Sequence, residues 1–402
     1  MLTTEEATDA ITAAMPPAGV QLTPLAKVLG QTLRQEVCAE RDQPPFDRVT
    51  MDGISIDFAA FAAGQRQFVI QSRQHAGDSR QSLNNPRNCI EIMTGAAAPA
   101  GTDCVIPVER ISVAGDIATL EVDYAPQQRQ FIHPQGSDHA KGKLLLSPGQ
   151  KISPMDVAVI ASCGLAELQV SRAPRIQVIS TGNELVAAGS PIADQQIRMS
   201  NGPAVVALLQ AHGYADCQHD HISDDKALLR ARLQDHLQTS NVMILSGGVS
   251  MGKADFVPEV LHELGVETVF HKISQRPGKP MWFGIGPDGQ AVFALPGNPV
   301  STLVCCRQYV LPALAHASGL AAQTPDYALL TEAFSFASDL TCFLPVRLAP
   351  AADGLLFATP VPTNTSGDFA ALSGTDGYLQ LDRNTSDFVA GSRWPLHRWN
   401  RL

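Results

Sequence analysis

The sequence lacks the features that mark membrane-spanning and secreted proteins. Its 402 residues contain no uninterrupted apolar run of about 18 residues, the length that a spanning helix needs. The N-terminal stretch MLTTEEATDAITAAMPPAG is acidic and amphipathic, and it has neither the basic region nor the apolar region of a signal peptide. These absences predict a soluble cytoplasmic protein that does not act at a membrane.

Basic residues are also scarce. The chain has 29 Lys and Arg against 39 Asp and Glu, a formal net charge of -10, and no basic block. Non-specific nucleic-acid binding depends on cations that neutralise phosphates, so we expect no nucleic acid among the partners. The eight cysteines form no CxxC pair, and most lie in apolar runs, which is typical of buried free thiols.

The length of the chain and its changing residue pattern indicate several domains. Apolar side chains at helical spacing predict helices over 3–15 and 23–38. Short apolar runs separated by turns predict an inserted β-rich domain at 46–140. We expect residues 1–45 and 141–174, on either side of it, to form one N-terminal helical or mixed domain.

The rest of the chain predicts a multidomain protein of α/β and β classes. Residues 175–325 alternate strands with helices of ten or more residues, which indicates a mostly parallel sheet covered on both faces. Residues 326–402 have no long helical period, and their short apolar runs predict a small β-barrel or sandwich.

Four polar loops follow strands of the predicted α/β domain. They are 180-STGNEL-185, 222-ISDD-225, 246-SGGVSMGKAD-255 and 295-LPGNPVS-301. Ligands of open parallel sheets bind outside the carboxyl ends of the strands, so we expect these loops to line one crevice.

Each loop has both a functional and a purely structural interpretation. Backbone N–H groups of Gly247, Gly248 and Gly252 are suited to hold an anion, although glycines also serve ordinary tight turns. Carboxylates at the same edge suggest Mg²⁺ held by oxygen ligands, although each also suits a helix N-cap. These carboxylates are Glu184, Asp224, Asp225 and Asp255.

Two further stretches carry similar alternatives. In 275-QRPGKP-280, Arg276 and Lys279 project from a rigid turn, either to clamp an oxyanion or as a solvated hairpin tip. Asn298 followed by Pro299 is a strong helix start on structural grounds alone.

Taken together, the motifs resemble those of the molybdopterin molybdenumtransferases, a family to which the C-terminal domain of gephyrin is similar. The matching stretches are colinear with the family pattern from about residue 45 to 301. They are MDG (51–53), IMTGAAAPAGTDCVIPVE (92–109), VISTGNEL (178–185), SNG (200–202), SGGVSMGKAD (246–255), RPGKP (276–280) and LPGNPVS (295–301).

The resemblance implies a four-domain, elongated homodimer whose cleft lies between the α/β domain of one subunit and the inserted domain of the other. It implies a reaction of adenylylated molybdopterin with molybdate, assisted by Mg²⁺, that releases AMP and leaves molybdenum on the dithiolene. It also suggests the molybdopterin adenylyltransferase as a partner.

The resemblance assigns roles to individual residues. Catalytic roles fall to Asp52, Thr94, Glu184, Asp255 and Lys279. The implied metal ligands are Glu184, Asp224 and Asp255. Substrate binding is implied for Gly247, Gly248, Ser250, Gly252, Arg276, Pro296, Asn298, Pro299 and, more loosely, Ser373.

The chain departs from the family pattern at several positions. FDNSAMDGYA becomes FDRVTMDGIS, with Arg48 and Ile54 among the changes, and Asn183 replaces an acid in TGDEL. Two rival interpretations remain open: a nucleotide pyrophosphatase on the same α/β domain, and a non-catalytic molybdopterin-binding or scaffolding paralogue. A preference for tungstate over molybdate also stays open.

Overall fold

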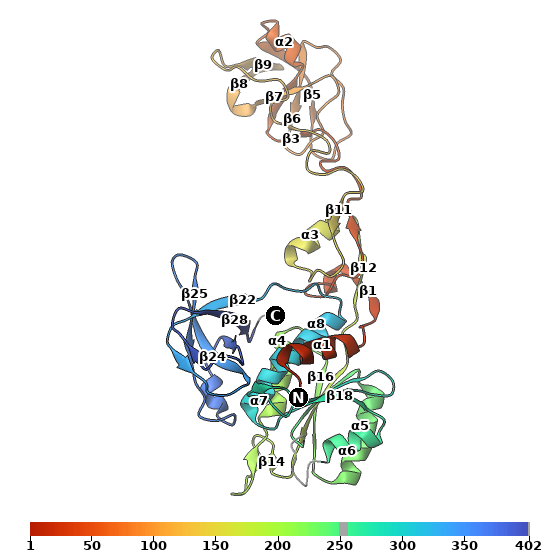
Figure 1. The fold of residues 1–402 in the computed structure, drawn as a ribbon. Helices are drawn as coiled ribbons and strands as arrows, with labels where there is room; N and C mark the ends of the chain where they lie inside the picture. Colours follow the sequence, from red (N-terminus) through yellow and green to blue (C-terminus); the bar gives the residue numbers. More distant parts are fainter. Residues whose placement is uncertain (249–255, 401–402) are drawn as a thin grey trace.

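A computed structural model describes residues 1–248 and 256–400 as an elongated molecule (Figure 1). An inserted sheet stands at one end, and a narrow connecting segment that includes α3 lies in the middle. The α/β sheet and the C-terminal strands lie beside each other at the other end. No helix in the described part of the chain is long and apolar enough to cross a membrane.

The first helix, α1 (Thr4–Ala14), packs against the α/β unit. It starts at a capping box in which Thr3 Oγ1 accepts from the Glu6 N–H and the Glu6 carboxylate accepts from the Thr3 N–H. Its buried face, which includes Ile11, belongs to the core of the α/β unit. The sequence predicted that residues 1–45, which include this helix, form one domain with residues 141–174. Helix α1 instead packs its apolar face on the α/β sheet.

Two strand pairs form the connecting segment. Strand β1 (Val20–Pro24) pairs antiparallel with β12 (Glu167–Ser171), and β2 (Val37–Cys38) pairs with β11 (Leu144–Leu146). Helix α3 (Pro154–Ser162) begins at a second capping box, formed by Ser153 and Asp156. The chain before the insertion is thereby joined to the chain after it.

The helix predicted over 23–38 is wrong. Only a single 3₁₀ turn, Leu25–Lys27, forms there. The following chain is extended: the Leu33 N–H donates to the carbonyl of Gln150, and Leu33 forms a bridge with Val170. Leu29, which the helical spacing placed on the apolar face, is 60% exposed. Pairing with distant residues satisfies the backbone groups that a local helix would have used.

The inserted sheet has six strands in the order β7-β4-β6-β5-β9-β8. The predicted β-rich character of this region is therefore confirmed. Helix α2 (Phe58–Ala62) follows β4, and β3 (Arg48–Val49) pairs with β10 (Ile132–His133). The six strands are β4 (Gly53–Ile56), β5 (Gln67–Gln74), β6 (Asn88–Ile92), β7 (Cys104–Pro107), β8 (Ile111–Ala114) and β9 (Ile117–Leu120).

The α/β unit is built on a six-stranded sheet in the order β16-β13-β17-β21-β20-β18. The first four strands are parallel and the last two are antiparallel, so the mostly parallel sheet is confirmed. Its strands are β13 (Ile176–Thr181), β16 (Cys217–Ile222), β17 (Val242–Ser246), β18 (Glu267–His271), β20 (Trp282–Ile285) and β21 (Ala291–Leu295). Its helices are α4 (Asn201–Ala211), α5 (Lys226–Thr239), α6 (Val257–Glu263), α7 (Pro299–Cys305) and α8 (Leu311–Ala317), with a π-helical turn at Cys306–Val310 between the last two.

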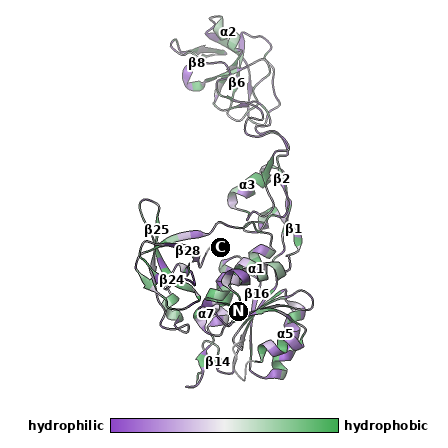
Figure 2. Ribbon diagram, in the orientation of Figure 1, coloured by the Kyte–Doolittle hydropathy of each residue, from purple (hydrophilic) through white to green (hydrophobic). Residues whose placement is uncertain are grey.

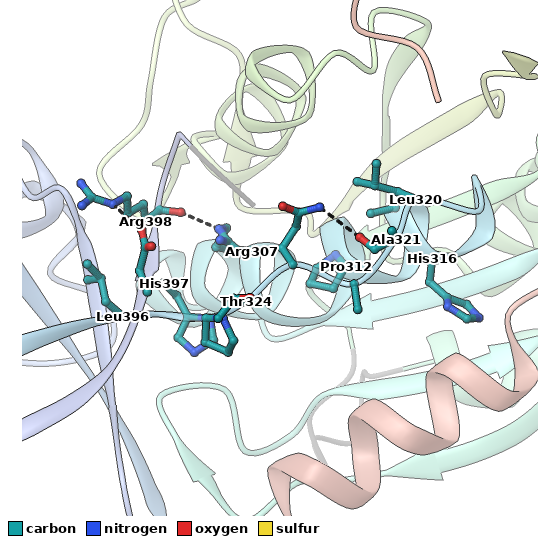
Figure 3. A pocket seen from close by; sticks show the side chains of 14 residues that line it. Arg307, Pro312, His316, Leu320, Ala321, Thr324, Leu396, His397 and Arg398 are labelled. Atoms are coloured by element: carbon teal, nitrogen blue, oxygen red, sulfur yellow. Dashed lines mark hydrogen bonds and ion pairs between the residues drawn. The ribbon is translucent and has the colours of Figure 1, made fainter. Parts of the chain in front are cut away.

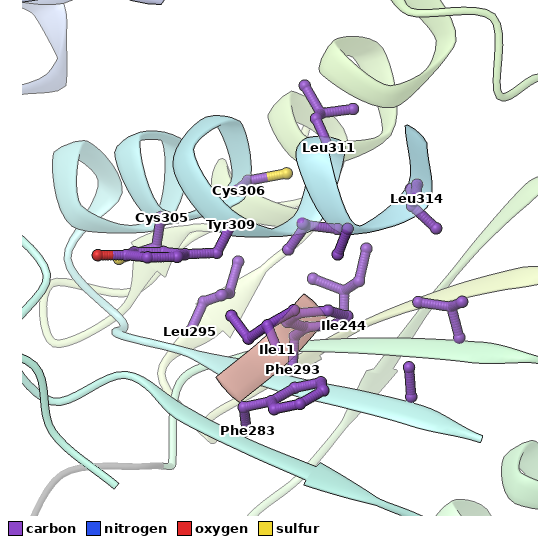
Figure 4. Packing of buried hydrophobic residues seen from close by; sticks show 14 of the residues in the cluster. Ile11, Ile244, Phe283, Phe293, Leu295, Cys305, Cys306, Tyr309, Leu311 and Leu314 are labelled. Carbon is purple, nitrogen blue, oxygen red and sulfur yellow. The ribbon is translucent and has the colours of Figure 1, made fainter. Parts of the chain in front are cut away.

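Helices cover both faces of this sheet. On one face, α1, α4, α7 and α8 pack against buried sheet residues such as Ile244 and Phe293 (Figure 4). On the other face, α5 and α6 pack against Met243 and Val292. Hydrophobic and hydrophilic residues alternate along α5 (Figure 2), because its buried leucines face the sheet and its charged residues face solvent.

The C-terminal region is a closed barrel of five strands. Each strand pairs with two others in the cycle β24-β25-β22-β28-β26, which closes through the pairing of β26 with β24. The strands are β22 (Asp326–Leu330), β24 (Thr341–Pro350), β25 (Leu356–Pro360), β26 (Gly377–Leu381) and β28 (Arg393–Arg398). Strand β19 (Gln275–Arg276) of the preceding unit pairs with β24, so the two regions share a sheet edge.

Short pairs complete the structure: β14 (Leu185–Val186) with β15 (Ile197–Arg198), and β23 (Phe334–Ser335) with β27 (Asp387–Phe388). All eight cysteines are free; Cys38 is exposed and the other seven are buried. The prediction that most of the cysteines are buried free thiols is thereby confirmed.

Candidate functional site

Four parallel strands end at the same edge of the sheet. Thr181 of β13 is in register with Ile222 of β16, and Ser246 of β17 is in register with Ser180 and Leu295. The loops after these strands therefore leave the sheet side by side. The polar loops therefore meet at one edge of the sheet, as the sequence predicted, and this edge is called the crevice below.

The first two loops are joined by Asn183 and Asp224. The Asn183 N–H donates to Asp224 Oδ2 at 3.2 Å, and the Asp224 N–H donates to Asn183 Oδ1 at 3.0 Å. Asp225, by contrast, caps α5 by accepting from the Leu228 N–H at 2.8 Å. The structural interpretation thus holds for Asp225, and the carboxylate of Asp224 stays at the crevice.

Glu184 lies beside this joined pair and is exposed. Its carboxylate folds back over Gly182, so that a Cβ on Gly182 would stand 2.6 Å from Glu184 Oε2. The backbone of Gly182 also has a φ of 146°, in the range that favours glycine. Glycine is therefore required for the acid to lie against the backbone of this loop.

The glycine loop begins with a close approach to β13. Gly247 and Gly248 both have positive φ values, 99° and 66°. A Cβ on Gly247 would lie 2.7 Å from the carbonyl oxygen of Thr181, and one on Gly248 would lie 2.7 Å from Val257 Cγ2. The Gly247 N–H donates to the Leu295 carbonyl at 3.4 Å. It is therefore engaged inside the fold.

Thr181 lies beneath this loop, and its hydroxyl is a buried polar atom with no hydrogen-bond partner among the described residues. The predicted site residues Ser250, Gly252 and Asp255 lie outside the described residues. Within residues 1–248 and 256–400, no three His, Cys, Asp or Glu side chains form a group that would hold a metal ion.

A cavity of about 490 Å³ adjoins the crevice. The predicted residues Arg276, Lys279, Pro296 and Asn298 all line it. Arg276 and Lys279 are exposed cations, and the guanidinium of Arg276 lies 5.8 Å from the ring centre of Phe336. The QRPGKP turn is therefore part of a concave, cationic site rather than an isolated hairpin tip.

The barrel supplies the opposite wall of this cavity, including part of β24 and the segment 362–366. Asn298 Nδ2 donates to Ser366 Oγ at 2.6 Å, which fastens the α/β loop to the barrel. Asn298 precedes Pro299 at the start of α7, but its side chain makes no capping hydrogen bond. Ser373 is exposed and is not among the residues that line this cavity, so its role stays a prediction.

The sequence did not single out Asn201 or Ser366 as site residues. Asn201 lies at the start of α4, and its Nδ2 lies 2.9 Å from Ser246 Oγ and 2.7 Å from the Gly297 carbonyl. It thus connects the ends of β17 and β21. Asn201 is part of the SNG motif that the sequence analysis noted, but its partners become visible only when α4 packs against the sheet edge.

Asp52 and Thr94 form a separate small site in the inserted sheet. Asp52 Oδ1 accepts from the Thr94 N–H at 2.6 Å and from the Thr94 hydroxyl at 2.7 Å. The backbone N–H first, and then the hydroxyl, hold the pKa of Asp52 below its ordinary value. The carboxylate is therefore ionised at neutral pH.

Within one chain, the inserted sheet that carries this pair stands at the opposite end of the molecule from the α/β sheet (Figure 1). Asp52 directly precedes β4 of the inserted sheet, whereas Lys279 precedes β20 in the α/β unit. The structure therefore brings the predicted residues together as two groups. It does not bring Asp52 and Thr94 to Glu184 and Lys279.

A different cavity, of about 340 Å³, lies between α8, the following linker and β28 (Figure 3). Arg307 Nε donates to the Arg398 carbonyl at 2.6 Å, and Arg398 Nε lies 2.9 Å from Asp326 Oδ2. Burial first, and then the charge of Arg307, lower the pKa of His397 to about 3. The residues that line this cavity include none of the predicted site residues.

Family models match three successive parts of the chain. The model described as the MoeA N-terminal region (domain I and II) matches residues 2–164. The model described as a probable molybdopterin binding domain matches residues 177–316, and that of the MoeA C-terminal region (domain IV) matches residues 327–395.

Whole-chain relatives agree with these matches. The chain is similar to the molybdopterin molybdenumtransferase of Synechocystis sp., with 38% identity over 374 residues that cover 92% of this chain and 93% of the relative. It is 34% identical to that of Synechococcus elongatus over 352 residues, 86% of each chain. A crystal structure of a molybdopterin biosynthesis MoeA protein from Pyrococcus horikosii has a TM-score of 0.83 at 27% identity, and the match covers 100% of both chains.

Proposed function

Because the chain belongs to the molybdopterin molybdenumtransferase family, we propose that it inserts molybdenum from molybdate into adenylylated molybdopterin and releases AMP in molybdenum cofactor biosynthesis. The observation that carries the proposal is the junction of the crevice with the cationic cavity. The loop after β21 belongs to both, since it leaves the crevice edge and places Pro296 and Asn298 in the cavity wall. A nucleotide-linked substrate and an oxyanion can thus be held beside each other.

The cavity is suited to molybdate. Molybdate is a small dianion, and Arg276 and Lys279 supply two cations from one turn. The planar guanidinium gives several fixed N–H donors, whereas the ammonium acts as a compact charge. The ring of Phe336 beside the Arg276 guanidinium limits the positions that this long side chain adopts.

The crevice is suited to the nucleotide-linked pterin. The backbone at Gly248 approaches β13 closely and has the positive φ that only glycine adopts without strain. Backbone N–H groups in such turns bind phosphate oxygens. Asp224 and Glu184 belong to the two adjacent loops, which Asn183 and Asp224 join.

These two carboxylates also fit the predicted Mg²⁺, which prefers oxygen ligands and usually keeps several waters. Asp224 is oriented by the Asn183 N–H, and Glu184 is exposed beside it. When bound, the ion would neutralise charge on the pyrophosphate. Asp255, the further ligand that the resemblance implies, lies outside the described residues.

We further propose that a second copy of the chain completes the site, in a homodimer. The ionised Asp52, held by Thr94, belongs to the inserted sheet, which stands at the opposite end of the molecule from the α/β sheet (Figure 1). A twofold arrangement would supply each crevice with the Asp52 of the other subunit. The molybdopterin adenylyltransferase is the proposed supplier of substrate, because adenylylation forms the molecule that this reaction consumes.

AMP release tests the function. Purified protein is incubated with adenylylated molybdopterin, Mg²⁺ and molybdate, and AMP is quantified. We expect release that requires molybdate and that falls at least about a hundredfold in Asp52→Asn and in Lys279→Ala. Asp116→Asn and Lys141→Ala, which change exposed residues away from both groups, serve as matched controls. Binding of the pterin without AMP release would instead support the non-catalytic paralogue.

Mixing two inactive variants tests the shared site. In equal mixtures of Asp52→Asn and Lys279→Ala chains, about half of the dimers are mixed, and each of these has one fully native crevice if Asp52 is supplied by the partner. About 25% of the native activity should therefore return. If Asp52 acted within its own chain, every crevice in the mixture would carry one substitution and no activity would return.

A further inference from the structure

The cationic turn at 276–280 rests on a buried side chain, that of Gln275. Gln275 is 0% exposed and directly precedes the turn. Its Nε2 donates to the Pro277 carbonyl at 3.0 Å and lies 3.4 Å from Cys305 Sγ. Its Oε1 accepts from the Tyr309 hydroxyl. One amide therefore connects the turn to the helical region that contains Cys305 and Tyr309.

The orientation of this amide is fixed by its partners. The Pro277 carbonyl only accepts, so the NH₂ group of Gln275 must face it. Burial raises the pKa of Tyr309, so the hydroxyl keeps its hydrogen and donates it to Oε1. Buried polar groups are costly unless they are paired, and here both ends of the amide are paired. A rotated amide would place its oxygen against the Pro277 carbonyl.

The backbone of the turn lies directly against this amide and the neighbouring thiol. Gly278 has a φ of 102°, and a Cβ there would stand 2.4 Å from Gln275 Nε2 and 2.4 Å from Cys305 Sγ. The Lys279 carbonyl accepts from the Ile273 N–H at 2.9 Å. Buried side chains therefore hold the turn together with backbone hydrogen bonds.

Tyr309 lies in the π-helical turn Cys306–Val310 between α7 and α8. Its side chain lies beside that of Cys305 (Figure 4). π-Helical turns occur frequently at functional sites. The neighbouring Gln308 contacts the barrel, where its Oε1 accepts from the Tyr378 hydroxyl at 2.9 Å. Adjacent residues of one turn thus contact the cationic turn and the barrel, which form the two walls of the cavity of about 490 Å³.

We propose that Gln275 and Tyr309 are positioning residues for the oxyanion. Both side chains are buried and act through the turn, which they hold so that Arg276 and Lys279 stay together in the cavity wall. Each cation alone is an exposed charge that water screens, so the anion depends on meeting both at once. The inference rests on the proposed function, because the turn is the molybdate-binding part of that site.

Direct binding of molybdate tests the proposal without requiring turnover. Titration calorimetry uses the full chain with sodium molybdate and no pterin. Tyr309→Phe removes only the hydroxyl and should weaken molybdate binding about threefold to tenfold. Gln275→Met removes both amide bonds and should weaken it at least about tenfold. Because the two side chains act through one bond, the double variant should bind no more weakly than Gln275→Met alone.

Tyr378→Phe is the matched control. It removes an equally buried hydroxyl, which bonds to Gln308 rather than to Gln275, and should leave molybdate affinity within about twofold of the native value. Lys279→Ala should abolish the measured binding, which locates it at the turn. A loss in Tyr378→Phe as large as in Tyr309→Phe would indicate a general loosening of the fold and would overturn the proposal.

AMP release separates this inference from the proposed function. The KM for molybdate should rise in Tyr309→Phe by the factor found for binding, while the KM for adenylylated molybdopterin stays unchanged. If the native chain binds molybdate but releases no AMP, the proposed function fails and the binding comparison still decides the inference. Native molybdate affinity in both Tyr309→Phe and Gln275→Met, or no binding by the native chain up to ~10 mM molybdate, would contradict the positioning role.

Discussion

The amide of Asn201 makes a contact whose removal should loosen the crevice. Its Nδ2 lies 2.9 Å from Ser246 Oγ, 2.7 Å from the Gly297 carbonyl and 3.2 Å from Thr302 Oγ1. An amide has two hydrogens, so two of these bonds form fully and the third is shared. One side chain thereby connects α4, β17 and the loop after β21.

We expect Asn201→Ala to lower the free energy of unfolding by about 2 kcal/mol, from two hydrogen bonds of about 1 kcal/mol each. Asn201→Asp keeps the shape of the side chain but turns a donor into a charged acceptor that faces the Gly297 carbonyl, which cannot donate. It should therefore cost more than Asn201→Ala. Both variants should raise the KM for adenylylated molybdopterin, because the crevice loops lose their common anchor.

Urea unfolding followed by tryptophan fluorescence measures this change. Replacing Trp394 and Trp399 by Phe leaves Trp282, in the α/β sheet, as the reporter. Asn384→Ala, at an exposed position of the barrel, is the matched control. A loss below about 0.5 kcal/mol in Asn201→Ala, or an aspartate variant as stable as the native chain, would refute the reasoning.

Three other predictions follow from local contacts. Thr94→Val removes the hydroxyl bond to Asp52 and should raise the pKa of that acid, so the acidic limb of the AMP-release profile should move to higher pH. His397 has a pKa of about 3 in the folded chain and about 6.5 in the unfolded chain, so the unfolded chain binds a proton in this pH range that the folded chain does not. The free energy of unfolding should therefore fall between pH 7 and pH 4, by up to about 3 kcal/mol more in the native chain than in His397→Phe. Urea titrations at the two pH values measure this difference. Gly202→Ala would place a methyl 2.0 Å from His219 Nε2, and thermal unfolding should show a loss of at least about 1 kcal/mol; unchanged melting would contradict the contact.

The α/β unit could be predicted well from the sequence, because its burial pattern is local. Strand β17 is buried along its whole length, and the helix before it, α5, repeats apolar residues at helical spacing with Leu229, Leu233 and Leu237. Because parallel strands end at the same edge of a sheet, the strand pattern alone predicts that the polar loops lie together there. Arg276 and Lys279 were found because a rigid turn carries both.

The remaining features depend on contacts between distant residues. Leu33 has the spacing of a helix face, but it pairs with Val170, and no local pattern shows that partner. The cavity wall that includes Ser366 forms only when the barrel packs against the α/β loops. The separation of Asp52 from the crevice is likewise a property of the whole chain rather than of any motif.

The connecting segment also determines how the inserted sheet moves. The chain crosses it twice, and the crossings are hydrogen-bonded to each other, for example from the Ala39 N–H to the Lys143 carbonyl and from the Gln43 N–H to the His139 carbonyl, at 2.9 and 2.8 Å. Two hydrogen-bonded crossings allow fewer orientations than a single flexible linker, because the two backbones must move together. We therefore expect the connecting segment to restrict the orientation of the inserted sheet, and with it the position of Asp52, relative to the α/β unit.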